Sequence, residues 1–435
     1  PKPAGPNAPV LRDLLLGANG FLKLNIDRVD LPEGENMREV SVQLEKYGGT
    51  VSMPYLRFLT PEGGHGEASG TARFKGLRLR QADTDLTLRY TTLDVQRLLG
   101  LIASLTVAEP DSVAPTARTR ARAERKAERK AERQLLPGNP SLLASGVLTA
   151  VLRVEADQVN YGAVRGSKFR LVSHLRNGEA RLDNCSVDAL QGHLGLSGYM
   201  RSPANRAHHP TQLQVRLQDI QLPALFGTMA DMGLGVLGAD NVLGALRGVA
   251  VLRTDLGRSF LPSLANTAGY LKTDIRGLEL VNVEALVQAL KILKSERTSH
   301  LYFEPVQGEF VLAEGQVLIP ELRLNSNLSN LEVSGHYGLS GATNLFIGLQ
   351  PMKALFGNND KRIERIQSGE PMTKADAKGK DKLTYVSLRR TAPGEKFQVR
   401  LFQRDERRDA QARLLEQYRA YLLTQRLDTT VRMVR

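Results

Sequence analysis

The chain has 435 residues with a formal net charge of +13, one cysteine and no tryptophan. A single cysteine excludes a scaffold held by internal disulfides. Hydrophobic residues make up 41% of the sequence and aromatic residues only 5%, so the apolar side chains are mainly aliphatic. A chain of this length predicts either two or three compact domains or one elongated repeat.

The start of the chain, PKPAGPNAP, carries neither an initiator methionine nor the basic and apolar regions of a signal peptide. No stretch of about 18 apolar residues occurs, which is the length that a membrane-spanning helix needs. We expect the sequence to be part of a longer polypeptide, with any membrane anchor outside it.

Strand patterns begin at residue 21, where Leu22, Leu24 and Ile26 alternate with polar residues and therefore share one face of a strand. The same two-residue period returns at 86–90, 213–217 and 397–401. Turns rich in Gly and Asn, at 47–49 and 176–178, favour antiparallel hairpins between such half-buried strands.

Much of the positive charge lies in residues 118–133, RTRARAERKAERKAER, and in the Arg-rich tail from residue 404. The run has no apolar stripe, which predicts an exposed helix or a disordered insertion. A solvated charged segment is the favoured interpretation, and a patch that attracts anionic head groups is the alternative. Because no aromatic residues are interleaved for base stacking, we expect no specific nucleic-acid partner.

Helical patterns are few. One covers 283–293, and the other lies near the end, where Leu414, Leu415, Tyr418, Tyr421 and Leu422 form an apolar stripe. Because that stripe is short, we expect the C-terminal amphipathic helix to cap the sheet rather than rest on a membrane.

A loose internal repeat of about 125 to 135 residues is visible. Each copy contains a strand, a Gly turn and a Ser-Gly pair, at 69–70, 197–198 and 334–335, and then closes on an alternating strand and a Leu-rich segment. Chance similarity is the alternative, because such turns are common in β proteins.

The amphipathic sheet can bury its apolar face in two ways. It can fold into a sandwich with a dry core, or it can curl incompletely and leave an aliphatic trough. Such a trough suits hydrocarbon, because burial gains about 0.8 kcal/mol per methylene without specific contacts. The candidate groove-lining residues are Leu22, Leu24, Ile26, Leu86, Leu88, Leu148, Leu152, Leu213, Val215, Leu217, Leu331, Val333, Leu345 and Ile347.

A family resemblance is strongest from residue 269 to about 402. GYLKTDIRGLELVNVEALVQALKILK, followed by FEPVQGEFVLAEGQVLIPELRLNSNLSNLEVSGHYGLSGATNLFIGLQPM, resembles the C-terminal region of AsmA-like proteins, a group related to TamB and to bridge-like lipid transfer proteins. The resemblance implies a periplasmic protein, anchored to the inner membrane by an N-terminal helix absent from this chain. It also implies a role in outer-membrane lipid homeostasis and biogenesis.

The fold expected is mostly β: an elongated, curved antiparallel sheet that forms an apolar groove, with a few short helices and the C-terminal helix. We divide the chain into β-groove segments at 1–108 and 141–268, the insertion at 109–140, the AsmA-like region at 269–403 and the tail at 404–435. The expected function is to hold or conduct phospholipid acyl chains between the membranes. A dry-cored envelope scaffold or outer-membrane protein assembly factor is the alternative.

Residues with catalytic potential are sparse. We interpret His65 and His208-His209 as surface loop histidines, because their spacing gathers no metal ligands. Cys185, in LDNCSVDAL, fits a small buried hydrophobic position on a strand. We therefore expect no catalytic residues, no metal, no cofactor and no enzymatic activity. The expected partners are phospholipid or another acyl lipid, membranes at one or both ends, and an envelope protein.

Overall fold

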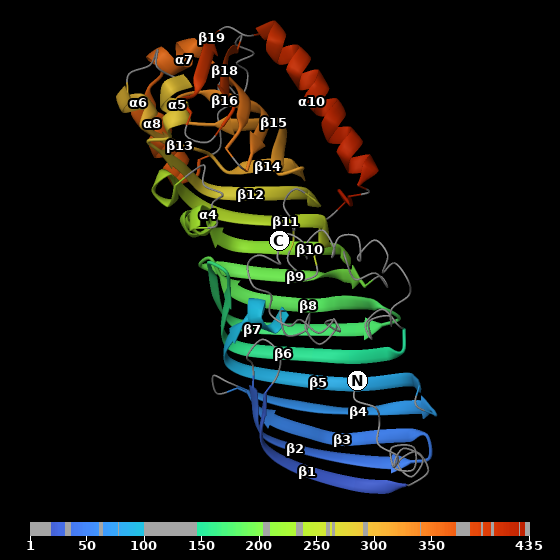
Figure 1. The fold of residues 1–435 in the computed structure, drawn as a ribbon. Coiled ribbons are helices and arrows are strands. Elements are labelled where there is room, and N and C mark those ends of the chain that lie inside the picture. Colours follow the sequence, from blue (N-terminus) through green and yellow to red (C-terminus); the bar gives the residue numbers. More distant parts are fainter. Residues whose placement is uncertain are drawn as a thin grey trace, which may run out of the picture.

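A computed structural model describes residues 19–30, 36–60, 64–76, 78–99, 146–202, 209–231, 238–257, 262, 266–289, 295–339, 341–370, 383–392, 395–401, 404–425 and 427–430. These residues form one sheet of 19 strands with a few short helices and one longer C-terminal helix. The sheet is long, curved and not closed into a barrel (Figure 1). The predicted fold class is confirmed. The predicted insertion at 109–140 lies outside the described residues.

The first twelve strands follow one another across the sheet. They are β1 (Gly20–Asp30), β2 (Asn36–Tyr47), β3 (Thr50–Leu59), β4 (His65–Lys75), β5 (Arg78–Asp94), β6 (Leu148–Tyr161), β7 (Val164–Arg176), β8 (Glu179–Ala189), β9 (Gly192–Arg201), β10 (His209–Gln221), β11 (Val242–Leu256) and β12 (Ala268–Val281). Each pairs with the next in chain order, so the sheet continues across the predicted segment boundary at residue 268.

The C-terminal strands continue the sheet in the same way. They are β13 (His300–Tyr302), β14 (Val306–Ala313), β15 (Gln316–Asn325), β16 (Asn330–Gly338), β17 (Thr343–Leu349), β18 (Thr384–Arg390) and β19 (Gln398–Leu401). Strand β13 pairs with one end of β12, and β14 pairs with the rest of that strand. From β14 onwards each strand again pairs with its successor.

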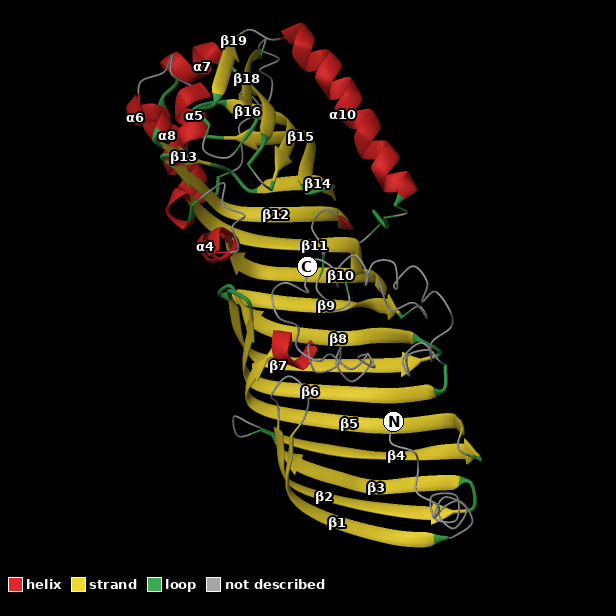
Figure 2. Cartoon of the chain, in the orientation of Figure 1, coloured by secondary structure: helices red, strands yellow, loops and turns green. Residues whose placement is uncertain are grey.

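Most of the helices gather at the C-terminal end of the sheet (Figure 2). They are α4 (Leu222–Asp231), α5 (Glu284–Ala289), α6 (Ser295–Thr298), α7 (Pro351–Phe356), α8 (Asn359–Ser368) and α10 (Arg404–Thr424), together with a 3-10 turn at Ala239–Asn241 and a short helix over residues 95–99. The predicted helix at 283–293 corresponds to α5, which is described only as far as residue 289.

One strand pair departs from the predicted antiparallel hairpins. β5 and β6 run parallel, with Leu86 opposite Leu152, whereas the other described pairings are antiparallel. The physical reason is the length of the connection. A two-residue turn can only reverse the chain, but residues 95–147 are long enough for the crossover that a parallel pair requires.

The Ser-Gly pairs occupy equivalent places in the sheet. Gly70, Gly198 and Gly335 lie on β4, β9 and β16, one strand before the strand that leads into a short helix. A Cβ atom on any of them would lie only 2.1 to 2.4 Å from a backbone carbonyl oxygen of the following strand. Each glycine therefore permits a close approach of two backbones. The same strand, glycine and helix order recurs three times along the sheet.

Candidate functional site: the apolar face of the sheet

The strand register places all of the candidate lining residues on one face of the sheet, here called the apolar face. Leu24 faces Val42 across β1 and β2, and Leu86 faces Leu152 across β5 and β6. Further along, Leu213 faces Leu252, and Val333 faces Ile347. Because cross-strand partners share a face, residues more than 300 positions apart in sequence line one continuous surface.

One line of cross-strand partners crosses most of this face. We call it the half-buried row and define it by its large apolar members: Leu24, Val42, Leu56, Leu86, Leu152, Leu182, Leu213, Leu252, Leu312 and Val317. Apart from Leu24, which is exposed, these side chains are half-buried. Neighbouring strands lie about 4.8 Å apart, so the row extends over roughly 60 Å from β1 to β15.

A second set of side chains beside this row, the buried floor, is closed to solvent. It comprises Phe58, Leu88, Val154, Ala156, Phe169, Cys185 and Val187. Val95 and Leu98, from the short helix at 95–99, pack against the same cluster. The apolar face therefore combines a packed floor with a partly solvated flank, and it is not uniformly open.

Strand β1 exposes the apolar face most strongly. Its predicted lining residues Leu22, Leu24 and Ile26 are 48%, 37% and 39% exposed. Among the described residues, β1 pairs only with β2. The register and the exposure together make this edge the most accessible part of the face.

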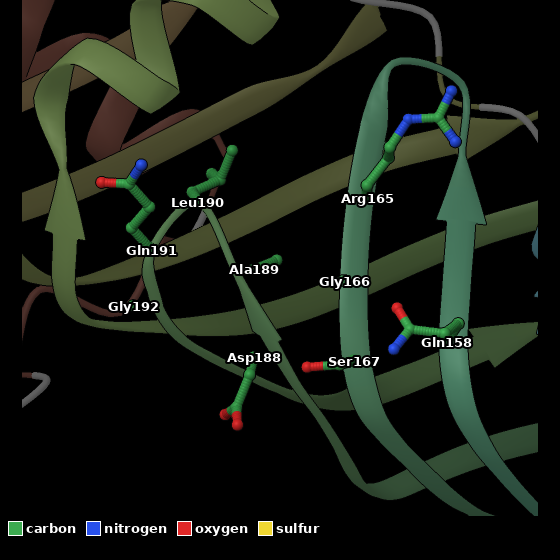
Figure 3. A pocket seen from close by; sticks show the side chains of 9 residues that line it. All are labelled: Gln158, Arg165, Gly166, Ser167, Asp188, Ala189, Leu190, Gln191 and Gly192. Carbon is green, nitrogen blue, oxygen red and sulfur yellow. The ribbon is translucent and has the colours of Figure 1, made fainter.

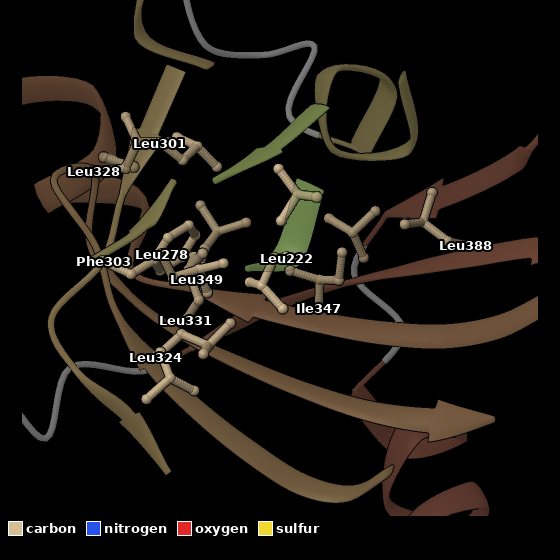
Figure 4. Close-up of a cluster of buried hydrophobic side chains, with 14 of the residues drawn as sticks. Leu222, Leu278, Leu301, Phe303, Leu324, Leu328, Leu331, Ile347, Leu349 and Leu388 are labelled. Atoms are coloured by element: carbon tan, nitrogen blue, oxygen red, sulfur yellow. The ribbon is translucent and has the colours of Figure 1, made fainter. Parts of the chain in front are cut away.

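At the C-terminal end the apolar face is sealed. A cluster that we call the closed core brings Ile220 and Val242 together with side chains from β12 to β18, including Leu331 and Ile347 (Figure 4). Leu222 and Ala354, from α4 and α7, join it. Leu331 and Ile347 are thus core residues, and Val333 and Leu345 pack against them.

The remaining predicted positions fall between these extremes. Leu148, Val215 and Leu217 are half-buried on the apolar face, and Leu217 also packs against the closed core. The prediction omitted several members of the half-buried row. Val42 had the same alternation as Leu24 and could have been found. Leu182 was harder to place, because a register shift between Leu182 and Cys185 puts an even and an odd position on the same face.

The opposite face of the sheet, here called the polar face, carries cross-strand ion pairs. Arg57 lies 3.3 Å from Glu67, and Arg89 lies 3.4 Å from Glu155. Arg247 donates two hydrogen bonds, of 2.7 and 3.0 Å, to the Asp219 carboxylate. These side chains are largely solvated, so each pair adds little stability. At these positions the two faces of the sheet therefore differ in chemistry, because one carries ion pairs and the other carries aliphatic side chains.

The C-terminal helix lies on the polar face. Leu414 packs with Val251, Tyr270, Val311 and Leu318, and Tyr418, Tyr421 and Leu422 pack against the same cluster. The expectation that this helix caps the sheet is confirmed. Arg407, near its start, forms an ion pair with Glu332 and lies 4.7 Å above the Tyr385 ring.

Apart from the apolar face, the polar side chains around Asp188 form the strongest candidate for a catalytic or polar-ligand site. His193 Nδ1 lies 2.8 Å from one carboxylate oxygen of Asp188, and Lys168 Nζ lies 2.9 Å from the other. The hydrogen bond with His193 is the main cause of the lowered pKa of Asp188, followed by that from Lys168. These groups, with His65 and Glu155, border a hollow of about 570 Å³. A carboxylate held ionised in this way is a poor general base near neutral pH.

A neighbouring hollow of about 550 Å³ lies where β6, β7 and the β8–β9 turn meet. Its polar side chains, including Arg165, Asp188 and Gln191, point in different directions rather than toward one point (Figure 3). A specific pocket for a polar ligand needs converging hydrogen-bonding groups. This hollow therefore offers a polar surface without the geometry of a binding site.

The histidine and cysteine predictions differ in outcome. His209 begins β10 and is buried, with its Nδ1 3.3 Å from the Ser202 hydroxyl, so the prediction of a surface loop was wrong there. His208 lies outside the described residues, whereas His65 is exposed at the start of β4. Cys185 is a buried strand residue, as predicted, and burial raises the pKa of its thiol to about 12.

Within the described ranges, no three or more His, Cys, Asp and Glu side chains are grouped so that they could hold a metal ion. In the same part of the chain, no helix has both the length and the apolar character to cross a bilayer. Comparison of the chain with protein-family models, with curated proteins and with solved structures found no match.

Proposed function

We propose that this protein holds the acyl chains of phospholipids, or of other acyl lipids, along the half-buried row and conducts them along the sheet. The observation that carries the proposal is the extent of that row. Large aliphatic side chains that are half-buried or exposed recur on it from β1 to β15, while the row positions on β4, β7, β9 and β12 hold Ala68, Ser173, Gly198 and Gly269. An acyl chain laid on them would remove both its own apolar surface and theirs from water.

The energetics suit a mobile guest. Each buried methylene contributes about 0.8 kcal/mol, and the gain depends on area rather than on one oriented contact. A chain can therefore shift along the row at little cost, because it exchanges one aliphatic neighbour for another. In keeping with the AsmA-like resemblance, we place this activity in the periplasm, where it would support outer-membrane lipid homeostasis without enzymatic chemistry.

A second candidate function is a scaffold for envelope proteins or for outer-membrane protein assembly. The closed core favours it, because strands β12 to β18 seal their apolar side chains as a dry-cored domain would. In that case the half-buried row would serve the stability of the sheet alone, and β1 would be the surface available for strand addition.

Lipid occupancy separates the two functions. We expect mass spectrometry of gently purified protein to detect bound phospholipid. A photoreactive phenylalanine analogue at Leu213, on the half-buried row, should crosslink to acyl chains. The matched control is the same analogue at Gln214, the next residue on the opposite face. Protein without lipid, or equal crosslinking at both positions, would favour the scaffold.

A further inference from the structure

Strand β1 forms a long edge of the sheet. It has eleven residues, Gly20–Asp30, without a proline, and its pairing with β2 runs without a register shift. Among the described residues no strand pairs with its outer side, which lies at the margin of the sheet (Figure 1). Natural sheets commonly shorten an edge strand, interrupt it with a bulge or block it with proline, because unpaired backbone groups attract another strand. β1 has none of these three features, whereas β19, at the other end of the chain, has only four residues.

Two opposite charges lie symmetrically about the centre of β1. Lys23 and Asp27 each stand two residues from Asn25, share the polar face with it, and are exposed. Within the described part of the chain neither forms an ion pair, whereas Arg28 is held by Asp30 at 2.7 Å. Elsewhere on the polar face, ion pairs join neighbouring strands. β1 therefore presents a cation and an anion that the described part of its own sheet does not use.

The apolar side chains of β1 have the same symmetry. Leu24 and Ile26 flank Asn25 and are 37% and 39% exposed. A strand with the sequence of β1, laid antiparallel to it about Asn25, would place Leu24 opposite Ile26 and Lys23 opposite Asp27. Both kinds of cross-strand pair stabilise a sheet. The edge is therefore complementary to itself in charge and in apolar character.

The geometry of the sheet selects one way of joining two such edges. A two-fold axis perpendicular to the sheet makes the strands antiparallel and keeps both apolar faces on one side. An axis along the strands would make them parallel and set an apolar face beside a polar one. Within the antiparallel pair, a slip of one residue exchanges the faces. A slip of two brings Lys23 opposite Asn25 or Val29, so only the register centred on Asn25 matches the charges, and it also uses all eleven residues.

We propose that β1 pairs with β1 of a second copy of this chain, antiparallel about Asn25, so that two sheets join into one symmetric dimer. Lys23 of each copy faces Asp27 of the other, and Leu24 faces Ile26. Because the interface is two-fold symmetric, each of these contacts occurs twice. The pairing does not depend on lipid binding. Where the proposed lipid function also holds, the half-buried row extends from one copy into the other, over roughly 120 Å in total.

Charge reversal tests the pairing in the complete 435-residue protein, by sedimentation equilibrium at low ionic strength over a range of concentrations. The unchanged protein should show a monomer–dimer equilibrium. Lys23→Asp puts an acid opposite Asp27, and Asp27→Lys puts a base opposite Lys23, so each variant should dimerise at least tenfold more weakly. An equimolar mixture of the two variants restores both oppositely charged pairs and should form a heterodimer as readily as the unchanged protein dimerises. Lys75→Asp, at an exposed position of β4, is the control for net charge.

A cysteine crosslink tests the register. Asn25→Cys should give a covalent dimer on mild oxidation, because residues directly opposite one another lie within about 7 Å, the Cα separation that a disulfide can bridge. Phe21→Cys is the matched control, since in this register its two copies are eight residues apart along the strand, or about 27 Å. The native Cys185 is buried and does not compete.

Several results would overturn the inference. They are a protein that stays monomeric at every concentration, single charge variants that dimerise like the unchanged protein, a mixture of the two that does not associate, and equal crosslinking at positions 25 and 21. Association of β1 with a different protein, but not with a second copy, would overturn it as well. Lipid occupancy measured on the same samples keeps the proposals distinct: occupancy without dimers refutes only the pairing, and dimers without occupancy refute only the lipid function.

Discussion

The two ends of the sheet use the same strand pattern with opposite results. In β1 the alternating residues Leu22, Leu24 and Ile26 remain exposed, whereas in β16 and β17 the equivalent residues Leu331 and Ile347 are almost completely buried. The difference lies in what surrounds each face. At the C-terminal end the strands bring their apolar sides together, and α4, α5 and α7 contribute Leu222, Leu286 and Ala354.

This difference suggests a division of labour within one sheet. The closed core supplies cooperative stability, because its members are mutually buried and cannot be solvated one at a time. The half-buried row has no such enclosure and leaves aliphatic area available to a guest. The two properties are hard to combine in one place, because a surface packed to the density of a core has no room for an acyl chain.

The largest expected effect comes from a charge in the closed core. Ile347→Asp should lower the free energy of unfolding by about 4 kcal/mol or more, because an unpaired carboxylate would replace a side chain that is 2% exposed. Denaturant unfolding measures this. Leu24→Asp, the matched change on β1, should cost less than about 1 kcal/mol. If the two variants lose the same free energy of unfolding, the two ends of the sheet do not differ in how tightly their apolar side chains are enclosed.

A smaller effect is expected where α10 covers the polar face. Leu414→Ala should cost about 2 to 3 kcal/mol, because it removes a buried side chain from the cluster with Val311 and Leu318. Leu423→Ala, at an exposed position of the same helix, should change stability by less than about 0.5 kcal/mol. Hydrogen exchange should show α10 opening faster in the first variant. Unaltered exchange would mean that the helix does not cap the sheet.

A charge on the half-buried row should alter ligand binding more than folding. Leu182→Arg should lower acyl-lipid occupancy about tenfold, which corresponds to about 1.4 kcal/mol. The guanidinium would have to be desolvated beneath the acyl chain. Asn184→Arg, on the polar face of the same strand, should leave occupancy unchanged. Quantitative mass spectrometry measures the lipid bound to each variant. If both variants lose the same amount of bound lipid, the added positive charge is the cause, and the position on the row is not.

The smallest expected effect concerns pH. The pKa of Asp188 is lowered from 3.8 in the folded protein, mainly by the hydrogen bond with His193 and then by that from Lys168. Its contribution to stability is therefore present above pH 3.8 and is lost as the pH falls through the lower folded value. Asp188→Asn should flatten the acid side of the stability profile. Asp157→Asn, at an exposed position, is the control. If the stability of the Asp188→Asn variant falls with acid just as that of the unchanged protein does, Asp188 does not make this contribution.

Local signals in the sequence were sufficient for much of the sheet. The alternation at 213–217 placed Leu213, Val215 and Leu217 on one face, and the Asn-Gly turn at 177–178 correctly indicated a hairpin. Both signals act over a few residues, so no tertiary contact is needed to interpret them. The same reasoning failed for the parallel β5–β6 pair and for His209. In the first case the partner strand β6 comes only after residues 95–147, and in the second His209 becomes part of β10 opposite Leu256 on β11.

By itself, the sequence determined a mostly β chain with one aliphatic face, because side-chain alternation and turn chemistry are local properties. Only the tertiary structure decided which parts of that face are sealed. Leu24 and Ile347 occupy the same kind of position in the same kind of strand, yet one is exposed and the other is buried. Burial depends on which strands and helices return to cover a surface, and that is a property of the whole chain.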